Sequence, residues 1–492
     1  MKQSIWLLSI SGMLIPNQMQ AGSEKATGKP NIVFILADDL GWADLPMYGN
    51  KFNEAPNLCK LAKQGVQFTN AYAAAPVSSP TRASIQSGQY PARVGITDFI
   101  PGHLRPYEEV TVPVNRTQYL PSKVITIAES MQKAGYITGY FGKWHLGEKS
   151  EHLPLNQGYR EANVGQGFYN VKFTPEREQS GDKVISERLA DFSIDFIDKN
   201  KKNPFFLFVS EWDVHCPYDS EKELIDKYMK KPKVKDYPCN AVYAAMIEQM
   251  DKSIGRIMAK LDKEGLSENT VFVFFSDNGG VCSEHKYPYI KEEKFPLIAE
   301  TKRDVYCRDN PLQYIGTVNT PLRNEKGSLY EGGIREPLIV KWPARMKADM
   351  LSNAVLTSVD FYPTFVELAN GEMPECQVVD GESFVPVLLS DKQDGERAIF
   401  WHYPVYHHDI PSSAVRKGDW KLIENLVNGS VLLYNLNTDI GETTDLSKAF
   451  PKKTKELDAL LKEWQKNVKA EFPKPNPNFN IKKRMEWGER KN

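Results

Sequence analysis

The sequence of 492 residues lacks three features that would point to particular classes of protein. Its six cysteines are scattered and none forms a CxxC pair, which argues against a zinc-thiolate site and leaves any disulfide pairing open. The formal net charge is −1, so the chain has no overall basic field and we expect no nucleic-acid partner. No stretch beyond the N-terminus reaches about eighteen apolar residues, so we expect no membrane span.

The N-terminus has the pattern of an export signal. Lys2 supplies a positive charge, "SIWLLSISGMLIPN" supplies a short apolar run, and Ala21, Gly22 and Ser23 supply small residues for cleavage. We therefore predict a signal peptide over residues 1–23 and a periplasmic or secreted protein. The alternative is an N-terminus that is merely disordered.

Continuous apolar runs alternate with amphipathic stretches through most of the chain. The runs "NIVFIL", "ITGYFG", "PFFLFVS" and "TVFVFFS" are typical of strands buried on both faces. Residues 55–65, 124–135 and 241–265 have helical periodicity, and each stretch ends in glycine. This alternation predicts an α/β fold around a large, mostly parallel sheet flanked by helices.

The C-terminal part differs in character. From about residue 395 the pattern predicts short strands separated by turns, and residues 452–472 predict a closing amphipathic helix. We therefore predict a domain over 24–394 that carries the parallel sheet. A smaller subdomain over 395–492 would contain an antiparallel sheet plus a helix.

Polar residues follow the apolar runs where the strands should end. Asp38 and Asp39 follow the first run, and Asp277 and Asn278 follow "TVFVFFS". Because ligands in open α/β sheets bind at the carboxyl ends of the strands, we expect these side chains to meet at one edge. They offer only oxygen ligands, which suit Ca²⁺ or Mg²⁺ better than zinc. Each pair taken alone could be a simple turn.

Basic groups come from the same kind of position. Lys143 and His145 follow "ITGYFG", and His215 follows "PFFLFVS". Together with Arg82 they suit an anion that develops negative charge.

The stretch "PVSSPTRASIQSG" raises the question of what Ser78 does. We expect Ser79 to cap a helix, Pro80 to be its first residue and Gly88 to end it. Ser78 would then lie just before a helix N-terminus, which is an anion-binding position. The alternative is a plain capping motif.

This stretch resembles the signature of the formylglycine-dependent sulfatases, C/S-x-P-S/T-R, within the alkaline phosphatase superfamily. "ADDLGWADLPMYG", "GYFGKWHLG", "PFFLFVSEWDVHCPY", "FFSDNGG" and "PLRNEKGSLYEGGIREPLIVKWP" follow the order of that family over roughly residues 30–390. A serine in place of cysteine at this position resembles the bacterial branch of the family, in which a radical enzyme carries out the maturation. Gln86 departs from the leucine usual in the family.

The resemblance implies a role for each matching residue. A maturation enzyme would oxidise Ser78 to formylglycine, whose hydrated aldehyde attacks sulfur. One Ca²⁺ ion would be held by Asp38, Asp39, Asp277, Asn278 and residue 78. The sulfate would be held by Arg82, Lys143 and Lys326. His215 would protonate the leaving oxygen, and His145 would take the proton whose loss expels sulfate and restores the aldehyde.

Two further segments have a pattern that suits substrate recognition. "WHYPVYHH" combines aromatic rings and imidazoles, so we predict sugar contacts from His402, Tyr403, His407 and His408. The alternative is a strand edge with incidental histidines. The long polar stretch 281–320 is a candidate specificity element.

Three functions remain open. We favour a sulfatase that removes sulfate from carbohydrates, with galactose or N-acetylgalactosamine sulfates of host or dietary glycans as the expected substrates. The second is a phosphatase or phosphodiesterase of the same superfamily, which would need zinc and more histidine ligands. The third is a non-catalytic glycan-binding relative, which would lack one of the key groups.

Overall fold

The computed structural model describes residues 28–169, 171–177, 183–235, 237–282, 315–390 and 396–489. The predicted signal peptide and residues 283–314 of the polar stretch lie outside these ranges, as does the predicted boundary at residue 394. No described helix is both long and apolar enough to cross a lipid bilayer. Five cysteines are free thiols, and the sixth, Cys307, is outside the described residues.

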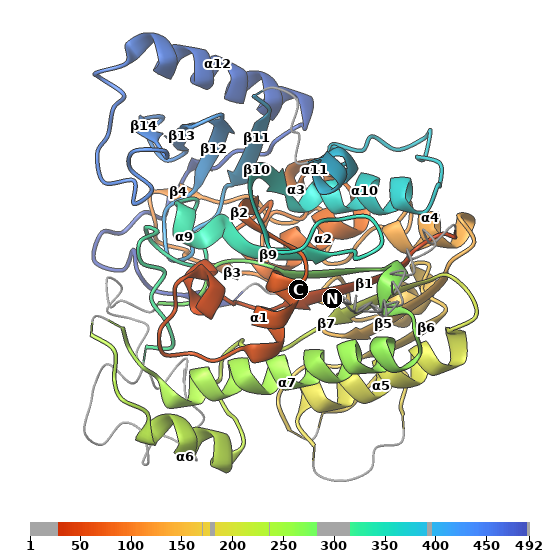
Figure 1. Ribbon diagram of the computed structural model, residues 1–492. Coiled ribbons are helices and arrows are strands. Elements are labelled where there is room, and N and C mark those ends of the chain that lie inside the picture. The colour runs from red at the N-terminus through yellow and green to blue at the C-terminus, as the bar shows by residue number, and fades with distance from the viewer. Residues whose placement is uncertain are drawn as a thin grey trace, which may run out of the picture.

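An eight-stranded sheet forms the centre of the molecule, in the order β10-β2-β9-β8-β1-β7-β5-β6 (Figure 1). All neighbouring pairs are parallel except those of β9, which runs antiparallel to β2 and to β8. The prediction of a large, mostly parallel sheet is therefore confirmed. Its strands are β1 (Asn31–Ala37), β2 (Val66–Tyr72), β5 (Ile137–Gly142), β6 (Glu161–Val164), β7 (Phe205–Ser210), β8 (Thr270–Ser276), β9 (Arg335–Lys341) and β10 (Met350–Thr357).

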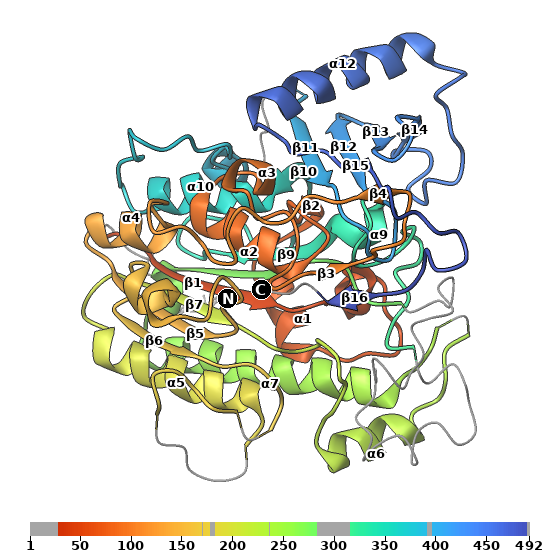
Figure 2. The ribbon, with the colours of Figure 1, turned by 180° about the vertical axis from the view of Figure 1, so that it is seen from behind.

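Helices cover both faces of this sheet, as Figure 2 shows from behind. One face carries α1 (Pro56–Lys63), α5 (Ile185–Asn200), α6 (Lys222–Lys230) and α7 (Ala241–Lys263). The other face carries α2 (Ser78–Ser87), α4 (Ile127–Lys133), α10 (Phe361–Leu368) and α11 (Val385–Ser390). The short helices α3 (Pro91–Val94) and α9 (Glu331–Ile334) lie in connections between these elements.

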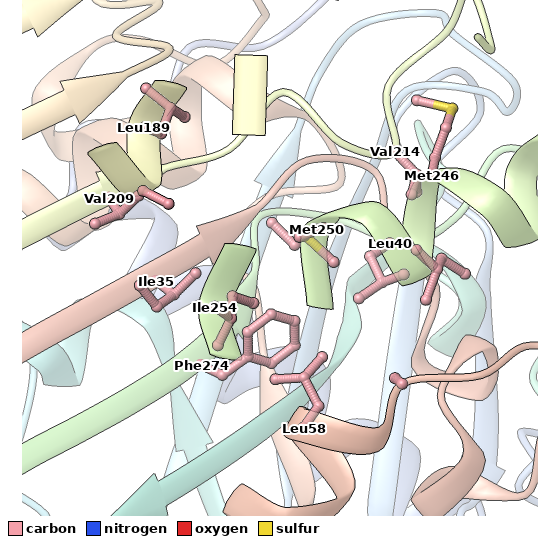
Figure 3. Close-up of a cluster of buried hydrophobic side chains, with 14 of the residues drawn as sticks. Ile35, Leu40, Leu58, Leu189, Val209, Val214, Met246, Met250, Ile254 and Phe274 are labelled. Atoms are coloured by element: carbon pink, nitrogen blue, oxygen red, sulfur yellow. The ribbon is translucent and has the colours of Figure 1, made fainter. Parts of the chain in front are cut away.

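The apolar runs are continuous because the central strands have core on both faces. Alternate side chains of β1 face different clusters: Ile35 packs with Met250 and Ile254 of α7 (Figure 3), whereas Phe34 packs with Phe361 of α10. Every residue of β1 is buried. Burial of this area supplies the main stabilisation of the fold, at roughly 25 cal/mol per Å² of apolar surface.

The predicted helices form, and the one over 124–135 has a shortened start. The helix predicted over 124–135 begins only at Ile127, because Thr126 and Glu129 form a reciprocal capping box. The Thr126 hydroxyl accepts a hydrogen bond from the Glu129 backbone, and the Glu129 carboxylate accepts one from Thr126 N–H. This cap fixes the first turn and excludes the preceding residues from the helix.

The C-terminal part contains a four-stranded antiparallel sheet and the helix α12 (Pro451–Asn467), which confirms the predicted arrangement, with the helix ending at Asn467 instead of the predicted residue 472. One face of the sheet packs on α12, and the other packs on Tyr72 and Ile334 of the larger part. The chain end returns to the larger part, where its short strands pair with β3 (His103–Leu104) and β4 (Val110–Thr111). The other strands are β11 (Ala398–Tyr403), β12 (Ser412–Lys417), β13 (Trp420–Asn425), β14 (Val431–Asn435), β15 (Lys474–Pro475) and β16 (Gly488–Glu489).

Candidate active site

The carboxyl ends of four parallel strands deliver the predicted polar residues to one place. Asp38 follows β1, Lys143 follows β5, His215 lies after β7, and Asp277 follows β8. These strands are neighbours in the order β8-β1-β7-β5, so their ends are adjacent. The side chains meet because parallel strands end at the same edge of the sheet.

Ser78 lies against the carboxylate cluster. Its hydroxyl oxygen is 3.2 Å from Asp38 Oδ1 and 3.4 Å from Asn278 Oδ1. Asn278 Nδ2 in turn donates to Asp39 Oδ1 at 2.7 Å, and Asp39 N–H donates to Asp277 Oδ1 at 3.2 Å. All five side chains are buried. The structure thus joins Ser78 to all four predicted metal ligands in one chain of contacts.

Three cations lie against the three carboxylates. Arg82 binds Asp277 Oδ2 through Nε at 2.9 Å and Nη2 at 2.8 Å. Lys143 Nζ is 2.5 Å from Asp38 Oδ2. Lys326 Nζ, supplied by a loop rather than a strand, is 2.8 Å from Asp39 Oδ2. Buried carboxylates need such compensation because an isolated buried charge is very costly.

The charge balance decides the protonation of the carboxylates. Burial raises the pKa of Asp38, but the permanent cations beside it, Lys143 above all and also Arg82, outweigh it and the net pKa shift is downward. Burial also raises the pKa of Asp39, and Lys326 contributes most to reversing it, so that pKa is lowered as well. Both carboxylates are therefore ionised near neutral pH and are available as hard oxygen ligands.

The two histidines present opposite ring nitrogens to the site. His215 Nδ1 lies 2.6 Å from the Cys216 carbonyl oxygen, which can only accept, so Nδ1 carries the proton. Its Nε2 lies 3.6 Å from Asp39 Oδ2. His145 Nε2 lies 2.6 Å from the Ile100 carbonyl oxygen and therefore donates to it. Among the described residues, none hydrogen-bonds to His145 Nδ1, which is buried.

Both imidazoles are neutral in this environment. Burial lowers the pKa of His145 well below its usual value, and Lys143 and Arg82 lower it further. Burial and Lys143 likewise lower the pKa of His215, although Asp39 acts in the opposite direction. A neutral His145 with an unpaired Nδ1 can accept a proton, and His215 Nε2 can exchange one with a bound group.

The donor atoms fit a hard divalent cation. Oxygens of Asp38 and Asp39 and a nitrogen of His215 lie within 4.8 Å of one another. The next groups along the contact chain, Asp277 and Asn278, add only oxygens on their ligating sides. The oxygens of Asp38, Asp39, Asp277 and Asn278 match the preferences of Ca²⁺, and none of these groups is a thiolate.

The start of α2 differs from the sequence prediction. The helix begins at Ser78 itself, Val77 is the N-cap residue without a side-chain cap, and Pro80 is the third helical residue. Ser79 does not cap the helix, because its hydroxyl instead accepts a hydrogen bond from Ile100 N–H at 3.0 Å. The correction places Ser78 in the first turn, where free backbone N–H groups favour an anion. Gly88 ends the helix at φ 67°, as predicted.

The unusual Gln86 is accommodated on the buried side of α2. Its Oε1 accepts a hydrogen bond from the Tyr159 hydroxyl at 3.1 Å, and its side chain is buried. Because the amide has a partner, the polar substitution leaves the packing of α2 intact.

The residues predicted to contact sugar divide into two pairs. His402 and Tyr403 are buried in β11, and the His402 ring bonds to Ser413 Oγ and to the Glu471 carbonyl oxygen. Neither side chain faces solvent, which corrects the sugar-binding prediction for both. Tyr403 packs against the larger part, whereas His402 is covered by Ser413, Glu471 and Phe472 of the C-terminal part itself.

His407 and His408 instead lie beside the loop that carries Lys326. A Cβ atom at Gly327 would be 2.2 Å from His407 Nδ1, so the glycine permits this close approach. His408 Nδ1 is 3.6 Å from Glu325 Oε2. These two histidines are therefore adjacent to the site.

Two residues near the site were missed from the sequence. The Trp212 ring lies 5.0 Å from Lys143 Nζ and 4.6 Å from the His215 ring. Its position between a predicted strand and His215 was an available signal. Asn319 has no such signal: its Nδ2 donates to the carbonyl oxygens of Gly280, Asn324 and Gly332, and so joins the Lys326 loop to the turn after β8.

The site combines buried carboxylates, three cations and two neutral histidines at one edge of the sheet. These groups suit an enzyme that hydrolyses sulfate or phosphate esters. The chain belongs to the sulfatase family, whose family model matches residues 30–371. A second model, the C-terminal region of N-sulphoglucosamine sulphohydrolase, matches residues 324–471. The protein is therefore a hydrolase of sulfuric esters.

Similar proteins support this membership. A sulfatase of Formosa agariphila is 30% identical over 92% of this chain and 90% of its own length. An N-acetylgalactosamine-6-O-sulfatase of Bacteroides thetaiotaomicron is 26% identical over 90% of this chain and 94% of its own. The crystal structure of Ps i-CgsB in complex with k-i-k-neocarrahexaose is 27% identical, with a TM-score of 0.73 over 89% of this chain and 93% of that one.

Proposed function

We propose that this sulfatase removes sulfate esters from carbohydrates, with galactose or N-acetylgalactosamine sulfates of host or dietary glycans as substrates. The relative from Bacteroides thetaiotaomicron is named for N-acetylgalactosamine-6-O-sulfate, and the similar Ps i-CgsB structure contains an oligosaccharide. The observation that carries the proposal is Ser78 in contact with Asp38 and Asn278, beside the cations Lys143 and Arg82.

Two groups would complete the site. Oxidation of Ser78 by a maturation enzyme would supply formylglycine, an aldehyde whose hydrate is the nucleophile. A calcium ion held by Asp38, Asp39, Asp277 and Asn278 would supply positive charge. The fit rests on the ionised carboxylates of Asp38 and Asp39, on the side-chain oxygens of Asp277 and Asn278 next to them, and on the position of Ser78 in the first turn of α2.

The remaining residues hold the ester and move protons. Lys143 lies on Asp38, which contacts Ser78, and Lys326 lies on Asp39, which is joined to Ser78 through Asn278. Their ammonium groups would therefore hold the sulfuryl oxygens. A bound sulfate ester adds negative charge beside His215, which favours protonation at Nε2 and donation to the leaving oxygen. His145 Nδ1 is the proton acceptor, because its other nitrogen is occupied by the Ile100 carbonyl.

Recognition of the sugar falls to residues around the Lys326 loop. His407 packs on Gly327, the residue that follows Lys326, and His408 lies beside Glu325. We propose that these histidines contact the sugar that carries the sulfate. His408 is buried like His402, but unlike His402 it lies beside the Lys326 loop. We further propose export through the signal peptide over residues 1–23, which would deliver the enzyme to extracellular or periplasmic glycans.

A panel of defined sulfated mono- and disaccharides, assayed with matured enzyme, tests the substrate. Release of sulfate from galactose or N-acetylgalactosamine sulfates, in preference to glucosamine sulfates, is the expected result. Ser78→Ala enzyme is the matched control for spontaneous hydrolysis. Faster turnover of a phosphate monoester than of the corresponding sulfate ester would instead favour the phosphatase function, and binding of sulfated sugar without turnover by matured enzyme would favour a glycan-binding protein.

A further inference from the structure

The loop of residues 323–333 joins the active site to the C-terminal sheet. On the site side, Gly327 N–H donates to the Pro76 carbonyl oxygen at 2.8 Å, two residues before Ser78. Gly279 N–H, next to Asn278, donates to the Gly333 carbonyl oxygen at 3.2 Å. The loop therefore contacts both the start of α2 and the turn that ends β8.

This contact leaves little room for the loop to move. A Cβ atom at Gly279 would be 1.9 Å from the Gly332 carbonyl oxygen, so the two backbones are already in close contact. Close-packed backbone transmits a displacement instead of absorbing it. A shift at one end of the loop would thus move Lys326, a loop residue whose ammonium group contacts Asp39.

The other side of the loop is held by buried charges. Lys421 of β13 lies 2.8 Å from Glu331 Oε1 and 2.8 Å from Glu442 Oε1. All three side chains are 0% exposed. Glu442 Oε2 also accepts a hydrogen bond from Glu331 N–H at 2.7 Å, and its carbonyl oxygen accepts one from Arg323 Nη1 at 2.6 Å. Lys421 thus binds Glu331, near the end of the loop, and Glu442, which in turn contacts Arg323 at its start.

The larger part of the chain completes this cluster. Glu331 Oε2 accepts hydrogen bonds from the Tyr72 hydroxyl at 2.7 Å and from Arg335 Nη1 at 3.2 Å. Tyr72 and Arg335 of the larger part bind one carboxylate oxygen of Glu331, and Lys421 of the C-terminal sheet binds the other. Contacts from both parts therefore fix the orientation of Glu331. Removal of the ammonium group would leave Glu331 and Glu442 without the cation that both contact, so the loop would lose the link that holds these two side chains together.

We propose that Lys421 is a positioning residue for the active site: through Glu331 and Glu442 it holds the 323–333 loop so that Lys326 lies against Asp39. The C-terminal sheet then contributes to substrate binding without contacting substrate. This inference rests on the proposed function only in assigning sulfate binding to Lys326.

The test compares Lys421→Met with Arg397→Met in matured enzyme. Arg397 forms another buried ion pair between the two parts, with Asp360 Oδ2 at 2.7 Å, but that pair does not contact the loop. Both variants should lower the melting temperature. Well below that temperature, Lys421→Met should raise KM for a sulfated sugar roughly tenfold with little change in kcat, whereas Arg397→Met should leave KM within about twofold.

A double-mutant cycle identifies the route of the effect. If Lys421 acts through Lys326, Lys421→Met should raise KM no further in a Lys326→Ala background, because coupled residues are not additive. Equal KM values for Lys421→Met and the parent enzyme, or fully additive effects, would overturn the proposal. If Lys421→Met does not fold, Glu331→Gln, which keeps the shape and removes the charge partner, should show the same pattern.

Hydrogen exchange supplies a readout that does not depend on sulfatase activity. Peptides covering residues 323–333 should exchange faster in Lys421→Met than in Arg397→Met under conditions where both are folded. Unchanged KM in Lys326→Ala would remove the proposed role of Lys326 in binding sulfate. The hydrogen-exchange rate of residues 323–333 would still decide whether Lys421 positions this loop.

Discussion

The hydroxyl oxygen of Ser78 lies 3.2 Å from Asp38 Oδ1, although 40 residues separate the two in sequence. The contact forms because α2 begins at Ser78 and points its N-terminus at the end of β1. Asp38 also binds Lys143, so a nucleophile made from Ser78 would lie beside both a candidate metal ligand and a cation that can hold sulfate. The predictions below depend on this relationship.

Ser78→Ala should abolish turnover while leaving the melting temperature nearly unchanged. The hydroxyl contributes two weak contacts in the folded protein, but its carbon is the one that maturation must oxidise. Mass spectrometry of active wild-type protein should show the peptide with Ser78 lighter by two hydrogen atoms.

The neighbouring Ser79 provides the control. Ser79→Ala loses one buried hydrogen bond to Ile100 N–H, which should cost about 1 kcal/mol of stability, and it should keep both the modification and turnover. Full activity of a protein with unmodified Ser78 would contradict the maturation mechanism.

Asp277→Ala should lose both bound calcium and activity. Asp277 adds a carboxylate to the oxygen cluster and is the nearest partner of Arg82, so its loss removes a ligand and leaves this buried cation with only the longer contact to Asp38. Metal analysis of the purified variant measures the first effect. Asp251→Asn is the control, since that buried carboxylate binds Leu58 N–H in α1 and should leave the calcium content unchanged. Stoichiometric zinc in the wild-type enzyme would count against the calcium site.

His215→Ala should slow a sugar sulfate far more than an activated aryl sulfate. A sugar alkoxide is a poor leaving group and needs a proton, whereas an aryl oxide leaves without much help. General acid catalysis contributes roughly 10²–10⁴-fold, so kcat/KM for the sugar should fall by that factor relative to the aryl ester. An equal loss on both substrates would assign the acid to another residue.

His145→Ala should behave differently from His215→Ala. Its buried Nδ1 is placed to accept a proton after the leaving group has gone, so turnover of the sugar and the aryl ester should fall alike. Steady-state rates on the two substrates measure the ratio. A substrate-dependent loss in this variant would exchange the roles of the two histidines.

His402 should make the enzyme less stable in acid. Burial lowers the pKa of His402 from 6.5 to about 4, although the hydrogen bond to the Glu471 carbonyl oxygen acts in the opposite direction. As pH falls from 6.5 to 4 the unfolded chain gains a proton that the folded ring resists, so stability is lost across this window, up to roughly 3 kcal/mol. Urea unfolding should show a weaker pH dependence between 4 and 6.5 in His402→Gln. An unchanged pH dependence would exclude the residue as the cause.

The sequence predicted the sheet and the location of the site for one physical reason. Strands buried on both faces must be apolar throughout, so runs such as β1 and β8 are visible, and the first polar residues after them mark the edge of the sheet. The resemblance to sulfatases added Lys326, which no periodicity would have selected from its loop.

Other features depended on neighbours that are distant in sequence. Ser79 has a good capping side chain, but its hydroxyl accepts a hydrogen bond from Ile100 N–H, so the helix begins two residues earlier than its own sequence predicts. His402 and Tyr403 have the composition of a sugar-binding patch, yet packing buries them, while His407 a few residues later lies at the Lys326 loop.

By itself, therefore, the sequence determined the four central strands β1, β5, β7 and β8, the oxygen-rich edge and the family. Only the tertiary structure decided which carboxylate pairs with which cation: Arg82 with Asp277, Lys143 with Asp38, and Lys326 with Asp39. Hydrophobic patterns in the sequence predict which segments are buried and where strands end, because these properties depend on each residue and its near neighbours. Charge pairing is set by the folded geometry, since the partners approach only after the sheet, α2 and the 323–333 loop have packed together.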